Sequence, residues 1–370
     1  MSQGKKRILC VVGTRPEAIK MAPVILALRA APWAQVRVLA TAQHRQMLDQ
    51  VLDVFDIVPD VDMDMMRPNQ SLPELTARLL GQLDGVLATE EPDVLLVQGD
   101  TTTVMTAAMA AFYRRIPVGH VEAGLRTGDL QNPFPEEMNR LVAGRLSRWH
   151  FAPTDSSRDN LLREGFDPAS IHVTGNTVID ALVDVSMREL PPPADVGADE
   201  RMVLVTAHRR ENFGAPFREI CRAIREIADR HPDVRILYPV HPNPNVADVA
   251  RAMLADHPRI TLCDPLDYLP FVAAMKRAEL ILTDSGGVQE EAPALAKPVL
   301  VMRRETERPE AVEEGVVKLV GPDYEAIVTE AGRLLTDPAA YAAMARGVSP
   351  YGDGKASARI VSILQRDLSA

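Results

Sequence analysis

The sequence is poor in cysteine, in long hydrophobic runs and in excess positive charge. Its three cysteines, Cys10, Cys221 and Cys263, are far apart and lie in apolar segments. This spacing favours a reducing compartment and argues against a disulfide framework or a zinc site. The longest run without a charged residue, Thr101 to Tyr113, has 13 residues, whereas a membrane-spanning helix needs about 20.

Positive charge is also limited, with 41 Lys and Arg against 51 Asp and Glu, a net charge of −10. A nucleic-acid backbone is therefore not expected as the main partner, and any anionic ligand must be held by local positive groups. The apolar stretch after Arg7 ends at Arg15 without a cleavage-site pattern, so it predicts a first core strand rather than a signal peptide. We expect a soluble cytoplasmic protein with no membrane partner.

The 370 residues exceed what one hydrophobic core usually serves, so two domains are expected. The clearest linker contains Pro191, Pro192 and Pro193, which cannot continue a helix. The predicted boundaries are an N-terminal domain over 1–190, a C-terminal domain over 200–349, and a terminal turn and helix over 350–370. The sequence does not indicate which domain that last helix contacts.

Short apolar runs alternate with helical patterns such as Ala18–Ala31, Phe217–His231 and Tyr324–Leu335. Continuous apolar strands separated by helices predict an α/β protein with doubly wound parallel sheets, because a parallel crossover needs a helix-length connection. The predicted strands are Arg7–Gly13, Val36–Ala42, Asp93–Gly99, Val118–Ala123, Trp149–Ala152, Ile171–Gly175, Met202–Ala207, Val234–Val240, Ile260–Cys263, Leu280–Thr283, Pro298–Met302 and Val316–Val320.

In the first half, polar clusters follow three predicted strands, where a parallel sheet opens its binding crevice. Gly13-Thr14-Arg15-Pro16-Glu17, ahead of Lys20, is either an anion site at a helix start or an ordinary turn with an exposed Arg15. Asp100 either lines a pocket or, with Thr101, caps the next helix.

The third cluster runs from His120 to Gly128 and continues along a loop to Pro133-Phe134-Pro135-Glu136-Glu137-Met138-Asn139-Arg140. It contains Glu122 at an apolar strand end. Glu122 could pair structurally with an arginine, since an unpaired carboxylate there would be costly. Alternatively, Asp100, Glu122 and Glu136 converge on one crevice and differ in pKa, as acid and base groups require.

In the second half, His208 ends a strand beside Arg209 and Arg210, which suits phosphate contact or proton transfer. His241 fits a structural or peripheral role. Asp284-Ser285-Gly286-Gly287 ends another strand and precedes a helix, an arrangement that favours a diphosphate, and Glu291 is then placed to bind a ribose.

Together these motifs, in their order and spacing, resemble the non-hydrolysing UDP-N-acetylglucosamine 2-epimerases of bacteria. The resemblance rests on five motifs: Gly13-Thr14-Arg15-Pro16-Glu17-Ala18-Ile19-Lys20, Gln98-Gly99-Asp100-Thr101-Thr102, His120-Val121-Glu122-Ala123-Gly124-Leu125-Arg126-Thr127, His208-Arg209-Arg210-Glu211-Asn212 and Asp284-Ser285-Gly286-Gly287-Val288-Gln289-Glu290-Glu291. It implies a GT-B-like fold of two Rossmann-like domains around a cleft, a homodimer, and no nicotinamide, metal or other cofactor. The implied reaction interconverts UDP-N-acetylglucosamine and UDP-N-acetylmannosamine for surface polysaccharide synthesis, by elimination of UDP to a 2-acetamidoglucal and its re-addition.

The resemblance also implies residue roles. The N-terminal domain would hold the sugar with the carboxylates Asp100, Glu122 and Glu136, and Lys20 would lie beside the sugar. His208 of the C-terminal domain would complete the catalytic set. The C-terminal domain would hold UDP, and the substrate-binding set is Arg15, Phe271, Ser285, Gly286, Gly287, Glu291 and Arg308. A second, activating UDP-N-acetylglucosamine would lie near Gln43, Gln46, Arg210 and His241.

Three rival functions remain open from the sequence. A hydrolysing epimerase would release free N-acetylmannosamine, a GT-B glycosyltransferase would need an acceptor, and a sensor would bind the nucleotide sugar without turnover. A dinucleotide oxidoreductase is excluded, because no Gly-x-Gly-x-x-Gly follows any predicted strand.

Overall fold

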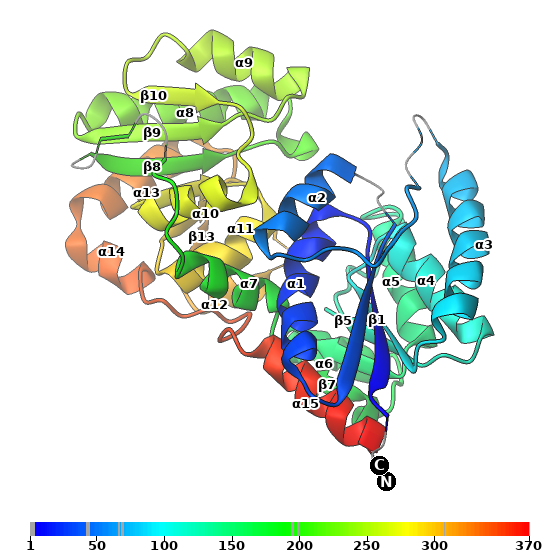
Figure 1. Ribbon diagram of the computed structural model, residues 1–370. Helices are drawn as coiled ribbons and strands as arrows, with labels where there is room; N and C mark the ends of the chain where they lie inside the picture. The colour runs from blue at the N-terminus through cyan, green and yellow to red at the C-terminus, as the bar shows by residue number, and fades with distance from the viewer. Residues whose placement is uncertain are drawn as a thin grey trace. The chain divides into compact units, whose positions relative to one another are not determined.

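The computed structural model describes residues 4–41, 45–65, 67, 70–193, 196–197, 200–306 and 308–369, with only the backbone of 45–47. The chain divides into two compact units (Figure 1). The first unit comprises Met1–Val183 and Tyr351–Ala370, and the second comprises Asp184–Pro350. Among the described residues, no helix is long and apolar enough to cross a membrane.

The first unit is built on a seven-stranded sheet in the order β3-β2-β1-β4-β5-β6-β7. Its neighbouring strands pair in parallel. The strands are β1 (Lys6–Val12), β2 (Ala34–Ala40), β3 (Val61–Asp62), β4 (Val94–Gln98), β5 (Val118–Val121), β6 (Trp149–Ala152) and β7 (Ile171–Val173). The order reverses between β1 and β4, which is the switch point of a Rossmann-like sheet.

Helices connect these strands, as parallel pairing requires. One face of the sheet packs on α3, α4 and α5 through a leucine- and alanine-rich core. Helix α1 contacts α2 and the terminal helix α15. The helices of this unit are α1 (Arg15–Ala30), α2 (Arg45–Val54), α3 (Leu72–Glu90), α4 (Thr102–Tyr113), α5 (Glu136–Leu146), α6 (Asp155–Arg163), η1 (Pro168–Ser170), α15 (Ala356–Ser369) and α7 (Thr177–Ser186), whose end belongs to the second unit.

The second unit repeats this design with a six-stranded parallel sheet in the order β10-β9-β8-β11-β12-β13. Its strands are β8 (Arg201–Thr206), β9 (Val234–Pro239), β10 (Ile260–Cys263), β11 (Leu280–Thr283), β12 (Val299–Val301) and β13 (Val317–Leu319). Its helices are η2 (Arg210–Asn212), α8 (Ala215–Arg230), α9 (Pro244–Leu254), α10 (Tyr268–Arg277), α11 (Gly286–Glu291), η3 (Ala292–Leu295), α12 (Pro309–Glu313), α13 (Tyr324–Thr336) and α14 (Pro338–Met344). The predicted pair of doubly wound parallel sheets is confirmed.

Local chemistry explains several helix ends. Ser71 accepts a hydrogen bond from the Glu74 N–H, and the Glu74 carboxylate accepts one from the Ser71 N–H, so a capping box begins α3. Gly165, which follows the C-cap residue Glu164 of α6, has a φ of 78°, a left-handed conformation that glycine adopts without strain.

The terminal helix α15 belongs to the first unit, which answers a question that the sequence leaves open. Asp180 in α7 accepts hydrogen bonds from the backbone N–H of Ala356 at 3.1 Å and of Ser357 at 2.8 Å. These N–H groups at the start of the helix have no partner within it, so the carboxylate satisfies them.

Candidate active site

In the first unit, the candidate site lies where β1, β4 and β5 end. Strands β1 and β4 are neighbours, and so are β4 and β5. The turns after them carry Arg15, Asp100 and Glu122, and Lys20 lies one turn further along α1. Parallel strands end at the same edge of a sheet, so residues about 100 positions apart come together there.

Glu122 is held in place from three directions. It has a φ of 64°, which is uncommon for a residue with a side chain, and it is 8% exposed. Its Oε1 accepts from the Lys20 Nζ at 2.5 Å and from the Asn176 Nδ2 at 2.9 Å, and its Oε2 accepts from the Gln98 side chain. Its ionic partner is thus Lys20 and not an arginine, so the pairing of Glu122 lies within the predicted site.

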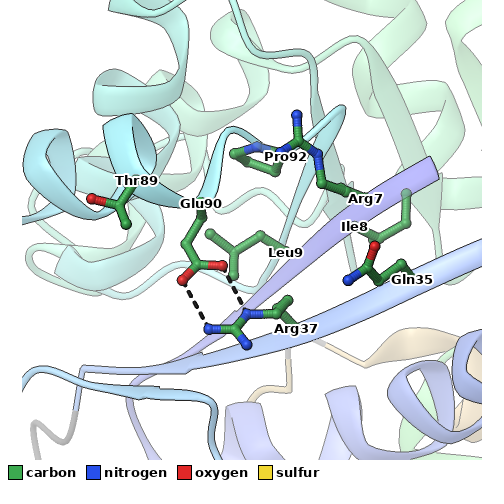
Figure 2. Close-up of a pocket in the computed structure, with 8 residues that line it drawn as sticks. All are labelled: Arg7, Ile8, Leu9, Gln35, Arg37, Thr89, Glu90 and Pro92. Carbon is green, nitrogen blue, oxygen red and sulfur yellow. Dashed lines mark hydrogen bonds and ion pairs between the residues drawn. The ribbon is translucent and has the colours of Figure 1, made fainter. Parts of the chain in front are cut away.

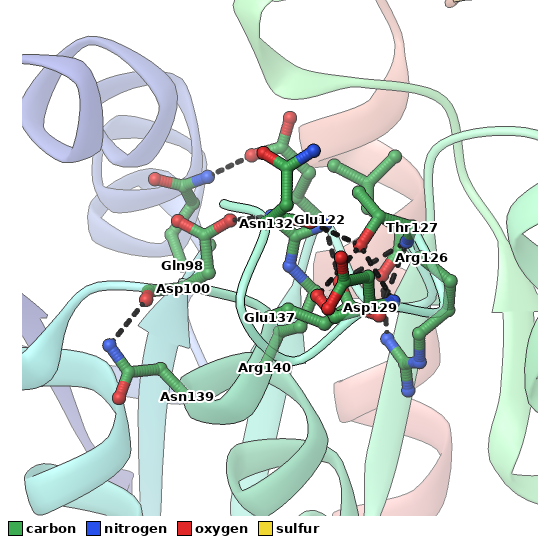
Figure 3. Close-up of polar contacts among 12 residues, drawn as sticks. Gln98, Asp100, Glu122, Arg126, Thr127, Asp129, Asn132, Glu137, Asn139 and Arg140 are labelled. Carbon is green, nitrogen blue, oxygen red and sulfur yellow. Dashed lines mark hydrogen bonds and ion pairs between the residues drawn. The ribbon is translucent and has the colours of Figure 1, made fainter. Parts of the chain in front are cut away.

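Asp100 lies beside a second cation. Its Oδ2 accepts from the Arg140 Nη2 at 2.6 Å, and its backbone carbonyl accepts from the Asn139 Nδ2 at 2.9 Å (Figure 3). Loss of solvent around the carboxyl raises the pKa of Asp100, and the nearby charge of Glu136 adds to this effect, while Arg140 and Lys20 oppose it. This carboxyl therefore keeps its proton to a higher pH than an ordinary surface aspartate does.

Glu136 begins α5 and faces the same group of charges, since its carboxylate acts on the pKa of Asp100. Its Oε2 is buried and has no hydrogen-bond partner among the described residues. A buried carboxylate oxygen without a donor is costly unless a ligand or water supplies one. The structure therefore brings Asp100, Glu122, Glu136 and Lys20 to one edge of the first sheet.

The loop before α5 is ordered by Glu137, a residue that the sequence alone does not single out. This buried carboxylate accepts from the N–H groups of Thr127 at 3.2 Å and Gly128 at 3.0 Å, and it pairs with Arg140 at 3.3 Å (Figure 3). Arg140 therefore bridges Glu137 and Asp100. The sequence places Arg140 beside Asn139 in the third polar cluster, but it does not show which carboxylates Arg140 contacts.

In the second unit, the corresponding edge is organised by Asp284 at the end of β11. Asp284 is fully buried. It accepts from the N–H groups of His208 at 2.9 Å and Arg209 at 2.8 Å, and from the Asn212 Nδ2 at 3.2 Å. Because β8 and β11 are neighbours, this carboxylate fixes the turn that presents His208.

The His208 ring lies 3.8 Å from Asp284, measured from Nδ1 to Oδ1, and stacks on His241 with ring centroids 5.4 Å apart. Burial lowers the pKa of His208, and the positive charges of Arg209 and His241 act in the same direction against Asp284. A neutral imidazole is favoured near pH 7, which can accept or donate a hydrogen bond.

Gly286 and Gly287 begin α11, directly after Ser285. A Cβ added to Gly286 would lie 2.6 Å from the Arg308 guanidinium, so that guanidinium packs over this backbone. Arg308 Nε donates to the Glu290 Oε1 at 2.7 Å. A cation and the N–H groups of this turn thus lie side by side, as an anionic ligand would require.

The remaining predicted residues occupy the following places. Glu291 ends α11 and is 8% exposed, and Phe271 lies in the first half of α10. Arg210 begins η2 and is exposed, and His241 is exposed, with its Nδ1 accepting from the Asn243 N–H at 3.1 Å. Gln43 lies outside the described residues, and so does the side chain of Gln46.

A separate pocket of about 220 Å³ opens elsewhere on the first unit (Figure 2). Arg37 in its wall makes a two-pronged contact with Glu90, at 2.8 and 2.9 Å. The lining residues are Arg7, Ile8, Leu9, Gln35, Arg37, Thr89, Glu90 and Pro92. None of them belongs to the predicted site.

The sequence matches a family of known proteins. Residues 26–365 match the protein family described as UDP-N-acetylglucosamine 2-epimerase. The chain is 54% identical to the UDP-N-acetylglucosamine 2-epimerase of Escherichia coli (strain K12), over 98% of this chain and 99% of that protein. It is 51% identical to the enzyme of the same name from Bacillus subtilis (strain 168), over 97% and 95% of the two chains.

Solved structures show the same likeness. The UDP-GlcNAc 2-epimerase of Neisseria meningitidis, in a crystal structure bound to UDP-GlcNAc, superposes with a TM-score of 0.88 at 47% identity, covering 97% of this chain and 100% of that one. The Methanocaldococcus jannaschii enzyme, in complex with UDP-GlcNAc and UDP, gives 0.80 at 34% identity, over 97% and 99%. These likenesses confirm the predicted GT-B-like fold class of two Rossmann-like domains. The chain belongs to the UDP-N-acetylglucosamine 2-epimerase family.

Proposed function

We propose that this protein interconverts UDP-N-acetylglucosamine and UDP-N-acetylmannosamine without hydrolysing either. The observation that supports this most is the pair Asp100 and Glu122 on adjacent turns, one with a raised pKa and one held by Lys20. Inversion at C2 needs a group that removes a proton from one face and another that returns it to the opposite face. Relatives that share the family crystallise with UDP-GlcNAc and UDP.

The proposed reaction begins with elimination. The C2 hydrogen leaves as a proton to a carboxylate, its bonding electrons form the C1–C2 double bond, and the C1–O bond breaks with its electrons on the diphosphate of UDP. The products of this step are 2-acetamidoglucal and UDP. UDP then adds back to C1 while C2 receives a proton on the other face, so atoms and charge balance without a redox partner.

In this proposal Asp100, Glu122 and Glu136 supply the proton-transfer groups and Lys20 lies beside the sugar. Arg15, His208, Ser285, Gly286 and Gly287 hold the diphosphate, where charge develops as the C1–O bond breaks. Glu291 binds the ribose, and Phe271 and Arg308 lie near the nucleotide. No cofactor enters any step.

The Asp100→Asn variant tests this assignment. General acid–base groups contribute about 10²–10⁴ in rate, so we expect kcat to fall at least a hundredfold while UDP binding persists. Asp53→Asn, an exposed aspartate on α2 of the same unit, is the matched control and should keep the wild-type rate. Wild-type turnover in Asp100→Asn would contradict the role of Asp100.

Two further proposals accompany the main one. The protein forms a homodimer, which sedimentation equilibrium measures directly. A second UDP-N-acetylglucosamine binds near Gln43, Gln46, Arg210 and His241 and activates the enzyme. Sigmoidal rate curves with UDP-N-acetylmannosamine, made hyperbolic by traces of the gluco isomer, are expected; curves that are hyperbolic without it would contradict the activation.

A further inference from the structure

Glu17 is a buried carboxylate in the first turn of α1, and the proposed mechanism does not use it. It is 2% exposed. Its Oε2 accepts from the N–H groups of Gly13 at 2.7 Å and Thr14 at 2.6 Å, and its Oε1 accepts from the Thr101 hydroxyl at 2.5 Å. All three donors are neutral groups.

The contacts of Glu17 go beyond capping its own helix. The bond to the Thr14 N–H belongs to a capping box at the start of α1, and the bond to the Gly13 N–H adds a contact with the residue before it. The bond to Thr101 reaches a different turn, the one between β4 and α4, where Thr101 follows Asp100 and caps α4 by accepting from the Val104 N–H at 3.3 Å. Glu17 is therefore joined to both turns at this edge of the sheet.

The two turns approach closely at this point. A Cβ on Gly13 would lie 2.7 Å from the hydroxyl oxygens of both Thr41 and Thr103, and 3.1 Å from the Glu17 Oε2. A small displacement of one turn is thus passed to the other, because no space remains between them. The first turn leads into Arg15 and the second carries Asp100.

A charged group is an expensive way to make these contacts. Burial raises the pKa of Glu17 to about 7, although its hydrogen bonds lower it. A glutamine could accept from the two N–H groups with its oxygen and donate to Thr101 with its nitrogen, without the cost of burying charge. The geometry therefore predicts that glutamine can replace Glu17 at this position.

We propose that Glu17 is a positioning residue, which holds the turn that carries Arg15 and the turn that carries Asp100 in a fixed register. The inference rests on the proposed function, in which Arg15 on one turn contacts the diphosphate and Asp100 on the other acts at the reacting carbon of the same substrate. Glu17 itself touches neither. Fixing both turns through one side chain sets the distance between the leaving group and the proton-transfer group.

The test compares Glu17→Ala and Glu17→Gln with the wild type, using UDP-N-acetylglucosamine as the substrate. Misplacement of a catalytic group by about 1 Å can cost about a hundredfold in rate. We expect Glu17→Ala to lower kcat by about tenfold to a hundredfold, with KM changed by less than about threefold because the nucleotide contacts of the second unit are intact. Glu17→Gln should return kcat to within about threefold of the wild type.

Glu74→Ala is the matched control. Glu74 occupies the same capping-box position in α3, but its carboxylate accepts hydrogen bonds from Ser71 in its own turn. This variant should lower the melting temperature slightly and leave kcat unchanged. The rates are expressed per folded molecule, with the folded fraction taken from circular dichroism, so that loss of folded protein is not counted as loss of kcat.

If Glu17→Ala does not fold, Thr101→Val and Thr101→Ser replace it. The valine removes both the bond between the two turns and the Thr101 cap of α4, whereas the serine keeps the hydroxyl for both, so only the valine should lower kcat. Wild-type kcat in Glu17→Ala or Thr101→Val, or equal losses in the Ala and Gln variants, would overturn the inference. Absence of epimerisation by the wild type would instead contradict the proposed function, so the two failures are distinguishable.

Discussion

His150 should make the first unit sensitive to acid. It lies in β6, directly opposite His120 of β5, and is 1% exposed. Neither ring nitrogen has a hydrogen-bond partner among the described residues, and the ring meets Phe166 edge-on at 4.6 Å. Burial lowers the pKa of His150 to about 3, and the nearby His120, Arg126 and His172 act in the same direction.

The sign of the effect follows from proton binding. The unfolded chain binds a proton at His150 below its ordinary pKa of 6.5, whereas the folded chain does not until about pH 3. The free energy of unfolding therefore falls as the pH drops below 6.5. At pH 5 the loss is RT ln[(1 + 10^1.5)/(1 + 10^−2)], which is about 2 kcal/mol and changes little if the folded pKa is 4.

His150→Phe removes this proton uptake while keeping an aromatic ring against Phe166. The two tryptophans of the chain, Trp33 and Trp149, both belong to the first unit, so tryptophan fluorescence during urea unfolding reports on that unit alone. At pH 8 the variant and the wild type differ only by packing. The free energy of unfolding of the variant minus that of the wild type should be about 2 kcal/mol larger at pH 5 than at pH 8. This corresponds to about 1 M in urea midpoint at a slope of about 2 kcal/mol/M.

Other groups titrate over the same pH range, but they are common to both proteins and cancel in the comparison. An equal midpoint difference at pH 5 and pH 8 would refute the reasoning. It would mean that protonated His150 has a hydrogen-bond acceptor in the folded protein, although neither ring nitrogen has a partner among the described residues.

Two more predictions address the nucleotide site and the terminal helix. Gly286→Ala places a methyl carbon 2.6 Å from the Arg308 guanidinium, which can move because it is the flexible end of the side chain, so the melting temperature should change by less than about 3 °C. The affinity for UDP, measured by calorimetry, should fall about tenfold, which is equivalent to the loss of one charged contact. Unchanged affinity would exclude Arg308 from nucleotide binding. Asp180→Ala removes the acceptor for two N–H groups at the start of α15. The free energy of unfolding should fall by about 1 kcal/mol, and amide hydrogen exchange in that helix should become faster. Unaltered exchange would show that the cap is dispensable.

Most of the fold could be predicted from the sequence because strands buried on both faces form continuous apolar runs. Trp149–Ala152, Ile260–Cys263 and Leu280–Thr283 have the predicted ends, and other strands differ by one or two residues. The strand Val61–Asp62 was not predicted, because two residues are too short to show a pattern. The position of α15 depends on Asp180, a contact between residues 176 positions apart, which no local pattern encodes.

The candidate site was predictable at the level of turns but not of contacts. Parallel topology places every turn after a strand at one edge, so Asp100 and Glu122 were expected to be near each other. The donors to Glu122 come from α1, β4 and the segment before α7, and only the strand register brings them together. The link from Glu17 to Thr101 depends in the same way on β1 lying beside β4.

Proton NMR of the wild-type protein with UDP-N-acetylglucosamine in heavy water tests the proposed C2 epimerisation most directly. The expected result is loss of the C2 proton signal from the nucleotide sugar, with growth of deuterated UDP-N-acetylmannosamine and no free N-acetylmannosamine. Accumulation of UDP with free N-acetylmannosamine would show a hydrolysing enzyme. Retention of the C2 proton in the absence of an acceptor would contradict epimerisation altogether.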